Sequence, residues 1–465
     1  MPFAAPLCFS QRRLGILRQL SASLIANVIA LAYGLVIGWA SPSLIILRNG
    51  EEAITEEEES WLGSLPFLGA FLSSVLYSYI NQHLGRKAAG YLTAVPFIIG
   101  LGITAYDSSK LFLYIARFIA GFGISGVNVF VTMYVGEISE DNFRGCLGNI
   151  RGTVADVGIT LMYIVGPYLS IRCMAIISVS LPLLFLFAYF WLPESPMFLL
   201  GKGRRSEALD AYLWLRGGDI QRAEEEMEKL SAVVVTTKDS SDEVTVINLL
   251  SVLGTRRALE IALILAFVQT FSGLQFMLSY CTTVFQKVGG SVSPETSAII
   301  FGFINTFGSL ISCFLADTVG RRPILIVTQI LEAVCLLGLA AYLYVMHAGT
   351  DVSSWGVLPI ISLSLFCFCV IVGPGNFMYV LMSETFRPEA RGLAMSIASS
   401  VLWLLSFISS KFYPNLASIL GFYGNFIFFG AVALFGAVYT YRRIPETKNR
   451  SLEDILRELN GVSSV

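Results

Sequence analysis

Long apolar runs separated by short polar stretches set the pattern along the 465 residues of this chain. A bilayer core needs about 20 apolar residues for each crossing helix, and twelve runs have about that length. The predicted spans cover residues 22–47, 61–80, 89–106, 111–136, 147–169, 172–192, 258–286, 297–316, 324–346, 355–382, 392–413 and 421–441. The pattern therefore predicts an all-α integral membrane protein with twelve transmembrane helices.

One longer polar stretch, residues 193–257, interrupts the apolar runs after the sixth span. Within it Ala208, Leu209, Tyr212, Leu213 and Leu215 form an apolar stripe at helical spacing, which predicts a soluble helix. We therefore expect two six-helix halves, 22–192 and 258–441, joined by a cytosolic helical linker over 193–257. Residues 1–21 and 442–465 would be the cytosolic termini.

Charged motifs at the ends of the spans occur twice, once in each predicted half. Glu137 is followed seven residues later by Arg144-Gly145, and Glu384 is followed at the same distance by Arg391-Gly392. The other repeated motifs are Gly85-Arg86-Lys87 with Gly320-Arg321-Arg322, and Pro193-Glu194-Ser195 with Pro445-Glu446-Thr447. Repetition at offsets of roughly 235–250 residues predicts two pseudo-symmetric halves.

The repeated charges predict a gate. The basic side chains of Arg86, Lys87, Arg321 and Arg322 would share one rim of the bundle with carboxylates, namely Glu137, Glu194, Asp317, Glu384 and Glu446. Charge-assisted hydrogen bonds among these groups, with Arg144 and Arg391, would tie the halves together and break when a cavity opens there. Partly exposed ion pairs are weak enough not to lock such a two-state device. A gate between two halves indicates a transporter.

Composition and charge narrow the choice further. The chain is 55% hydrophobic and 14% charged, whereas soluble domains average about 25% charged. A net charge of −2 gives no reason to expect a nucleic-acid partner. If the N-terminus is cytosolic, 25 of the 31 Lys and Arg residues lie on the cytosolic side, so both termini are expected there. Since no catalytic or metal-binding pattern is evident, we expect neither an enzyme nor a cofactor nor a metal.

The motifs together resemble those of the sugar porters of the major facilitator superfamily, over residues 20–455. Besides the repeated charges, the resemblance rests on these residues: Arg117, Gly121, Tyr134, Pro196, Gln269, Ser272-Gly273, Pro323, Gly373-Pro374-Gly375 and residues 445–453. Within the family, the short outer loop and the opening of span 2 at Trp61 look most like the insect facilitated trehalose transporter group. The resemblance implies the major facilitator fold and transport of a small sugar.

The resemblance also implies a central sugar site. Neutral sugars need amides to bond their hydroxyls and aromatic rings to pack their faces. The positions that match the family's cavity are Gln269, Gln275, Asn305, Asn376, Tyr379 and Trp403. We expect Ser272-Gly273 to unwind span 7 between its two glutamines. Gln275 and Asn376 depart from the family pattern, so the gate is preserved better than the pocket and the sugar stays open.

Asp156 is an acidic residue inside the fifth span, and intramembrane carboxylates are usually functional. Proton-coupled sugar porters use an Asp in span 1, and the matching stretch here, residues 33–38, has none. We therefore expect facilitative transport of a hexose or a disaccharide such as trehalose, by a monomer in the plasma membrane. The alternatives are a proton symporter that uses Asp156 and a non-transporting sugar sensor. Asp156 could also be a polar contact or a sugar ligand.

Overall fold

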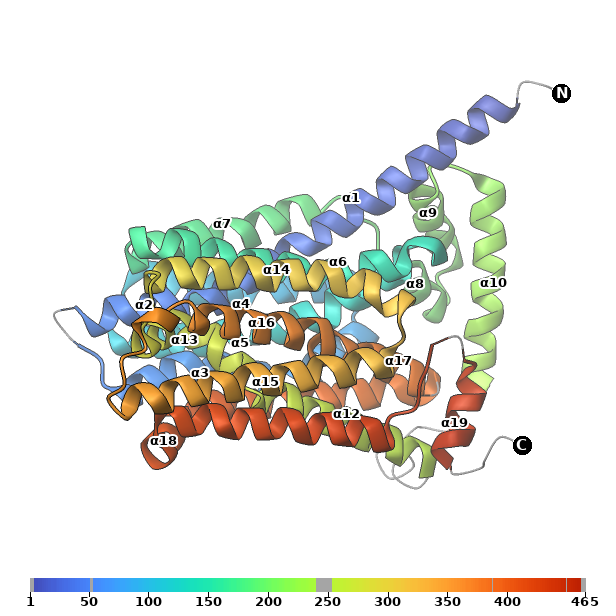
Figure 1. The fold of residues 1–465 in the computed structure, drawn as a ribbon. Coiled ribbons are helices and arrows are strands. Elements are labelled where there is room, and N and C mark those ends of the chain that lie inside the picture. Colours follow the sequence, from blue (N-terminus) through green and yellow to red (C-terminus); the bar gives the residue numbers. More distant parts are fainter. Residues whose placement is uncertain (1–3, 51–52, 240–252, 387, 449, 461–465) are drawn as a thin grey trace.

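The computed structural model describes residues 4–50, 53–239, 253–386, 388–448 and 450–460 of the chain. Within these ranges every regular element is a helix, and the long helices run side by side as one bundle (Figure 1). Both termini lie at the same end of the bundle, next to the short helices that follow the sixth crossing (Figure 1). We call this end the linker end and the other the opposite end.

The first half begins with α1 (Ala4–Gly38) and α2 (Ala40–Arg48), which together make one crossing. The half continues with α3 (Glu56–His83), α4 (Arg86–Tyr106), α5 (Lys110–Ile138), α6 (Asp141–Val165), the short turn η1 (Gly166–Tyr168) and α7 (Ile171–Tyr189). The start of α3 shows why a helix begins there. Thr55 accepts a hydrogen bond from the Glu58 backbone while the Glu58 carboxylate accepts one from the Thr55 backbone, which is a capping box.

The second half follows the same plan. It comprises α12 (Leu253–Phe271), α13 (Leu274–Val288), α14 (Pro294–Thr318), α15 (Arg321–His347), η2 (Ser353–Trp355), α16 (Leu358–Val370), η3 (Ile371–Gly375), α17 (Asn376–Thr385) and α18 (Pro388–Arg443). Gly273, at φ 101°, separates α12 from α13, and Gly421, at φ 76°, interrupts α18. Glycine allows both breaks because side chains disfavour positive φ. The predicted unwinding of span 7 at Ser272-Gly273 thus agrees with the break at Gly273.

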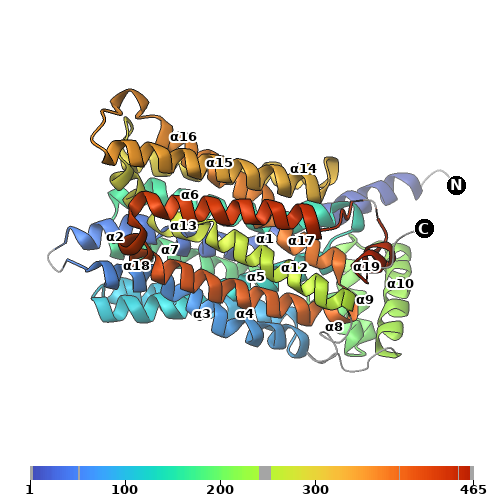
Figure 2. The same cartoon turned by 60° about the horizontal axis from the view of Figure 1, so that its bottom comes forward.

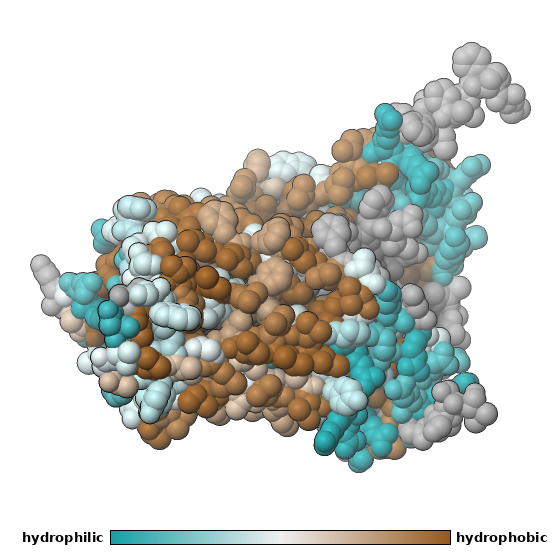
Figure 3. Space-filling view, in the orientation of Figure 1, coloured by the Kyte–Doolittle hydropathy of each residue, from teal (hydrophilic) through white to brown (hydrophobic). Residues whose placement is uncertain are grey.

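The number of crossings agrees with the sequence. Among the described residues, nine helical stretches are long and apolar enough to cross a membrane, with α18 counted as one. The chain turns back at Gly421, so α18 supplies two crossings, and α6 and α14 also run along the bundle (Figures 1 and 2). On the face shown in Figure 3, a broad apolar band covers the bundle between two more hydrophilic ends. The prediction of an all-α membrane fold with twelve crossings in two halves is confirmed.

Short helices cover the linker end. The predicted linker contains α8 (Pro196–Gly201), α9 (Arg205–Leu215) and α10 (Ile220–Asp239), while its residues 240–252 lie outside the described part. The last helix, α19 (Leu452–Asn460), packs against the start of α12, where Asn460 Oδ1 accepts a hydrogen bond from the Gly254 backbone at 2.7 Å. These helices lie outside the apolar band.

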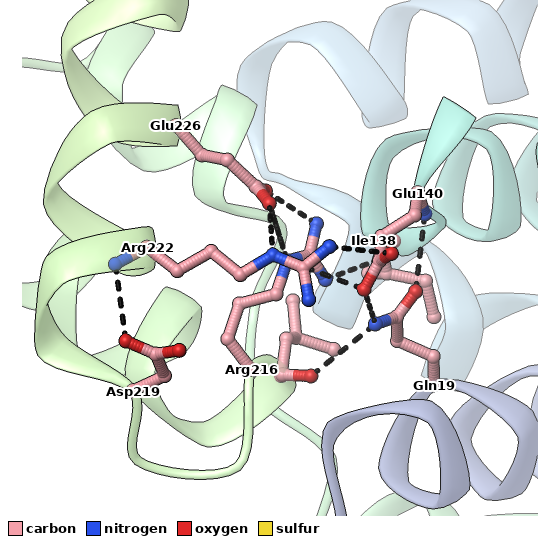
Figure 4. Close-up of polar contacts among 8 residues, drawn as sticks. Gln19, Ile138, Glu140, Arg216, Asp219, Arg222 and Glu226 are labelled. Carbon is pink, nitrogen blue, oxygen red and sulfur yellow. Dashed lines mark hydrogen bonds and ion pairs between the residues drawn. The ribbon is translucent and has the colours of Figure 1, made fainter. Parts of the chain in front are cut away.

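A polar cluster fastens the linker to the first half (Figure 4). Arg216, at the end of α9, is buried and bonds both the Glu226 carboxylate and the Ile138 carbonyl. Glu140, in the turn between α5 and α6, accepts a hydrogen bond from Gln19 of α1 at 2.8 Å and one from Arg222 of α10 at 2.7 Å. These buried charges are paired, as buried charges must be to avoid a large desolvation cost. The linker helices therefore form one unit with the first half.

Candidate functional site between the two halves

A charge cluster at the linker end joins three segments of the first half. Arg86 Nε donates to Glu137 Oε2 at 2.8 Å, and Ser195 Oγ donates to the same carboxylate. The Glu194 carboxylate accepts hydrogen bonds from the backbone N–H groups of Arg86 (3.1 Å) and Lys87 (3.0 Å). The first N–H groups of a helix have no partner within the helix and favour an anion there. The two carboxylates therefore fasten the start of α4 to α5 and to the segment before α8.

The second half contains a copy of this cluster. Arg321 Nη2 donates to Glu384 Oε1 at 2.8 Å, and Thr447 Oγ1 donates to the same carboxylate. The Glu446 carboxylate accepts hydrogen bonds from the backbone N–H groups of Arg321 and Arg322, both at 3.1 Å. The motifs that the sequence shows twice thus make the same contacts twice.

Burial separates the two otherwise matched carboxylates. Burial raises the pKa of the Glu194 carboxyl, and the backbone N–H groups around it offset this effect only in part. Burial acts in the same direction on Glu446, but four backbone N–H donors outweigh it and lower the pKa of that carboxyl. The difference arises because taking a carboxylate out of water penalises its charged form, whereas donors favour that form.

Every hydrogen bond named in these two clusters joins residues of a single half. In this structure, therefore, these bonds do not tie the two halves together at the linker end. A hydroxyl pair does join them there, because Ser78 Oγ donates to Ser396 Oγ at 3.2 Å. The side chains of Arg144, Asp317 and Arg391 lie outside the described residues, so their part in a gate stays a prediction.

At the opposite end the halves are bonded directly to each other. The hydrogen bonds between them join Ser41 to Thr282 (2.8 Å), Lys411 to Ser60 (2.8 Å), Tyr280 to the Glu59 carbonyl (3.3 Å) and Tyr163 to the Leu278 carbonyl (2.7 Å). An ion pair of 3.7 Å between Lys287 and Glu56 adds to them. Since these bonds come from several helices of each half, the opposite end is closed.

Midway along the bundle, polar side chains of α6 and α14 meet across the boundary between the halves, which we call the seam. Asn305 Nδ2 donates to Asp156 Oδ1 at 2.8 Å. Hydroxyl pairs flank this bond, Thr153 with Ser309 at 3.3 Å and Thr160 with Thr306 at 3.1 Å. A carboxylate in a membrane-spanning helix is costly unless it is hydrogen-bonded, and here the donor comes from the other half.

Asn305, one of the predicted sugar ligands, is fully buried in the seam. Its amide nitrogen is used by Asp156, and its oxygen accepts a hydrogen bond from the Cys367 thiol at 3.1 Å. In this state, then, the protein itself occupies the hydrogen-bonding groups that the prediction assigns to sugar. Any ligand of Asn305 would have to compete with Asp156.

Three other predicted ligands lie on the two sides of the break in span 7 and on α18. Gln269 and Gln275 are both buried, and the Oε1 atom of Gln269 has no hydrogen-bond partner among the described residues. Trp403 stacks on Phe67 of the first half at a ring distance of 6.2 Å, and its Nε1 also has no partner there. Unpaired buried polar atoms are uncommon and cost about 1–3 kcal/mol each. A hydroxyl-rich ligand that reached these two atoms would supply the hydrogen bonds that they lack.

The last two predicted ligands face the first half. A Cβ atom placed on Gly152 would lie 3.8 Å from Asn376 Oδ1 and 3.5 Å from Ser309 Oγ, so the bare backbone of α6 faces these two side chains. Tyr379 is electrostatically close to Arg151 of α6. The structure therefore places Asn376 and Tyr379 near α6, the helix of the first half to which Asn305 is also bonded.

The sequence interpretation missed Arg151 as a site residue and used it only for orientation. Its Nε atom is buried and has no hydrogen-bond partner among the described residues. The guanidinium is electrostatically close to Tyr33 of α1, Asp156 of α6 and Tyr379 of α17. The signal was available, because Arg151 lies inside the predicted span 147–169 and a charge in a span points to function.

The seam combines an amide, hydroxyls and the Asp156 carboxylate, with the Arg151 guanidinium electrostatically close to that carboxylate. These groups suit a neutral ligand with many hydroxyls, which can both donate to the carboxylate and accept from the amide. Among the described residues, no group of three or more His, Cys, Asp or Glu side chains is placed to hold a metal ion.

Solved structures share this fold. The proton:xylose symporter XylE bound to 6-bromo-6-deoxy-D-glucose superposes with a TM-score of 0.77 at 20% identity, over 94% of this chain and 98% of XylE. The inward open conformation of XylE from E. coli superposes with a TM-score of 0.76, also at 20% identity, over 94% and 99% of the two chains. At this identity the likeness concerns the fold alone.

Curated relatives match almost the whole chain. The facilitated trehalose transporter Tret1 of Culex quinquefasciatus is 29% identical over 448 residues, which cover 95% of this chain and 86% of the relative. Tret1 of Drosophila willistoni is 29% identical over 447 residues, so this chain spans only about half, 51%, of that relative. The profile of the sugar (and other) transporter family matches residues 24–459. The chain is therefore a multi-pass membrane protein that belongs to the sugar (and other) transporter family.

Proposed function

We propose that this chain carries a sugar, either a hexose or a disaccharide such as trehalose, down its concentration gradient by alternating access. The two halves would rock against each other around the seam, so that the site opens to one side of the membrane at a time. Family membership supports a sugar carrier, and the trehalose transporters among the relatives support a disaccharide as one candidate.

The observation that carries the proposal is the polar seam between the halves, where Asn305 bonds Asp156, together with buried polar atoms of predicted ligands that lack partners. At the opposite end several hydrogen bonds and an ion pair join the halves, although Glu59 Oε1 and Thr283 Oγ1 lack partners there among the described residues.

Polar atoms of Gln269, Trp403 and Arg151 are buried without partners among the described residues. Trp403 stacks on Phe67 of the first half, and Arg151 is electrostatically close to Asp156 in the seam. A sugar that reached the seam would supply hydroxyls to these atoms, so binding would recover part of their desolvation cost.

Sugar binding would also compete with a bond between the halves. Asn305 belongs to the second half and Asp156 to the first, and their bond spans the seam. A sugar hydroxyl that accepts from Asn305 would leave Asp156 to accept from another hydroxyl of the same ligand. The ligand would thus replace one bond between the halves with bonds to itself, which lets binding shift the equilibrium between the two open forms.

The distribution of positive charge supports an orientation with both termini and the linker end in the cytosol. In that orientation the closed end faces outward, and the structure represents a state shut to the outside. We further propose that the protein works as a monomer in the plasma membrane.

Uptake of a labelled panel of trehalose, glucose and xylose into cells that express the full chain tests the proposal. We expect at least one sugar to equilibrate across the membrane without rising above its outside concentration. Accumulation that collapses with a protonophore would instead indicate proton symport, and Asp156→Asn should then abolish the accumulation. Protein at the cell surface that binds sugar without any flux would identify a sensor and refute the proposal.

A further inference from the structure

A cavity of about 780 Å³ opens at the opposite end, away from the seam. Arg48 of α2 and Glu56 and Glu59 of α3 line it from the first half. The second half contributes residues of α13, the end of α15 and the bend of α18, among them Thr283, Lys287, His347 and Tyr413. The volume lies in the range of small-molecule sites, about 300–1,000 Å³.

Aromatic rings form one wall of this cavity. The rings of Phe276 and Tyr413 stack with centroids 3.5 Å apart, and Tyr280 lies 5.4 Å from Phe276 and 6.2 Å from Tyr413. The wall joins α13 to α18, so it belongs to the second half alone. A flat apolar wall of this kind packs well against the C–H face of a pyranose ring.

Two buried polar atoms in the lining lack partners among the described residues. Glu59 is 4% exposed. Its Oε2 atom accepts a hydrogen bond from Arg48, while its Oε1 atom has no hydrogen-bond partner. Thr283 is 6% exposed, and its Oγ1 atom has no partner either. A buried acceptor from one half and a buried hydroxyl from the other, both on residues that line one cavity, point to an occupant that carries its own hydroxyl groups.

Charge in the lining excludes an ionic occupant. Arg48 pairs with Glu59, and Lys287 pairs with Glu56 at 3.7 Å, so neither sign of charge is left over from these pairs. A phosphate or a carboxylate would have to displace one partner of a pair that bridges or borders the two halves. A neutral ligand needs no such exchange.

We propose that this cavity is a second saccharide site, which binds a neutral sugar of one or two rings at the opposite end, away from the seam. A ring hydroxyl would donate to Glu59 Oε1, another would bond Thr283 Oγ1, and a ring face would pack on Tyr280 and Tyr413. Only the choice of saccharide as the hydroxyl-rich ligand rests on the proposed function. The cavity and its unpaired atoms do not depend on it.

Occupation of this site has a consequence for transport. Its lining comes from both halves, and the bond from Tyr280 to the Glu59 carbonyl is one of those that close this end. A ligand that contacts both halves in the closed form binds that form better than the open one, so it shifts the population toward closure. High sugar concentration on this side therefore slows reopening and reduces flux.

Equilibrium binding to the purified full chain tests the proposal, with labelled trehalose and labelled glucose as the probes. For at least one of them we expect two sites per chain. Thr283→Val keeps the side-chain volume and removes only the hydroxyl, and Glu59→Gln removes the charge. Each should weaken one site roughly 5- to 150-fold, the range that a lost buried hydrogen bond gives, and leave the other unchanged. Glu57→Gln is the matched control, because Glu57 is exposed on the same helix and does not line the cavity.

The outcomes separate this proposal from the proposed function. Loss of one site in Gln269→Ala and of the other in Thr283→Val supports both. A single site that responds to Thr283→Val but not to Gln269→Ala supports the cavity and speaks against sugar binding in the seam. A single site that responds only to Gln269→Ala, no saccharide binding at all, or a lipid bound in the cavity would overturn the second site.

Discussion

The two charge clusters at the linker end are near copies, whereas the two sides of the seam are not. The first cluster, Arg86, Glu137 and Glu194, has its counterpart in Arg321, Glu384 and Glu446. In both, the arginine side chain bonds the first carboxylate, and the second accepts from backbone N–H groups. In the seam, α6 contributes Arg151 and Asp156, while the facing helix α14 contributes an amide and hydroxyls. Both halves therefore use the same contacts to hold their own helices, and the groups that face each other across the seam differ between them.

This comparison separates two kinds of function. A cluster that is repeated in both halves serves a task that each half has, such as keeping its helices rigid. A set of residues that differs between the halves is suited to a ligand that has no two-fold symmetry of its own. We therefore expect substitutions in the clusters to affect the halves as bodies, and substitutions in the seam to affect which sugar is bound and how tightly.

Neutralising the arginines that follow the repeated glutamates should have the largest effect on transport. Arg144→Ala or Arg391→Ala removes one charge from a gate motif, and we expect flux to fall at least about tenfold, since 1.4 kcal/mol corresponds to a factor of ten. Membrane insertion should be unaffected. Sugar uptake normalised to surface-labelled protein measures the effect. Normal flux at normal surface level in Arg391→Ala would remove the argument that the repeated motifs form a gate.

Replacing the matched arginines Arg86 and Arg321 tests whether the two clusters contribute equally to stability. Arg86→Met leaves the Glu137 carboxylate, 11% exposed, without its positively charged partner, and Arg321→Met does the same to Glu384, which is 26% exposed. Breaking a buried pair costs about 3–5 kcal/mol, and an exposed one about 0–1 kcal/mol. We expect a loss of about 3 kcal/mol for Arg86→Met and about 1–2 kcal/mol for Arg321→Met, measured by unfolding of the purified protein.

A double variant shows how much of the loss in Arg86→Met comes from the charge that it leaves unpaired. Arg86→Met combined with Glu137→Met removes both charges, and replacing both partners of a buried pair by apolar groups is often nearly neutral. The double variant should therefore be more stable than Arg86→Met alone. Equal losses in the two halves, or a double variant no better than the single one, would show that the clusters do not differ in the way their burial implies.

In the seam, deletion of amides should weaken sugar binding. Asn305→Ala and Gln269→Ala each remove a buried group that the proposal assigns to sugar hydroxyls, at a cost of about 1–3 kcal/mol. The half-saturation concentration should therefore rise roughly 5- to 150-fold at unchanged surface level. Gln329→Ala is the matched control, because Gln329 is a buried amide of the second half to which no sugar contact is assigned. Its Oε1 accepts from Thr440, and its Nε2, like the Oε1 of Gln269, has no partner among the described residues. Alanine variants with the parental half-saturation would leave these amides with a purely structural role.

The sequence predicts the repeated, local features of the molecule better than it predicts the contacts across the seam. The twelve crossings, the break of span 7 at Gly273 and the repeated motifs were all readable, because hydrophobic length, glycine and charge act locally. The bond between Asp156 and Asn305 was not readable, since it joins residues 149 positions apart whose helices meet only in the folded bundle. Asp156 therefore has three possible roles in the sequence. Arg151 is a different case, because its place inside the predicted span 147–169 is visible in the sequence and points to the site.

The clusters illustrate a subtler limit. The sequence predicts that Glu194 and Glu446 sit among basic residues, and they do, but the bonds described run to the backbone at helix starts and stay within one half. A pattern of charges shows which groups can pair and cannot show which of several partners is nearest. The extent of burial, which sets the two carboxyls apart, likewise depends on neighbours from distant parts of the chain.

The smallest expected effect is the opposite pH dependence of these two carboxyls. The folded-state pKa of Glu194 is raised, so its contribution to stability is fully present below the unfolded-state value of about 4.3 and declines as pH rises through the folded-state pKa. The folded-state pKa of Glu446 is lowered, so its contribution is present above about pH 4.3 and is lost as pH falls through the folded-state pKa.

Unfolding of the wild type, Glu194→Gln and Glu446→Gln between about pH 3 and 7 separates the two effects, since glutamine keeps the shape and cannot ionise in this range. As pH rises, the wild type should lose stability relative to Glu194→Gln and gain it relative to Glu446→Gln. Titration of other groups affects all three proteins alike and cancels in the differences. Stability differences that change in the same direction with pH would mean that Glu446 is as buried as Glu194 and that burial does not distinguish the two clusters.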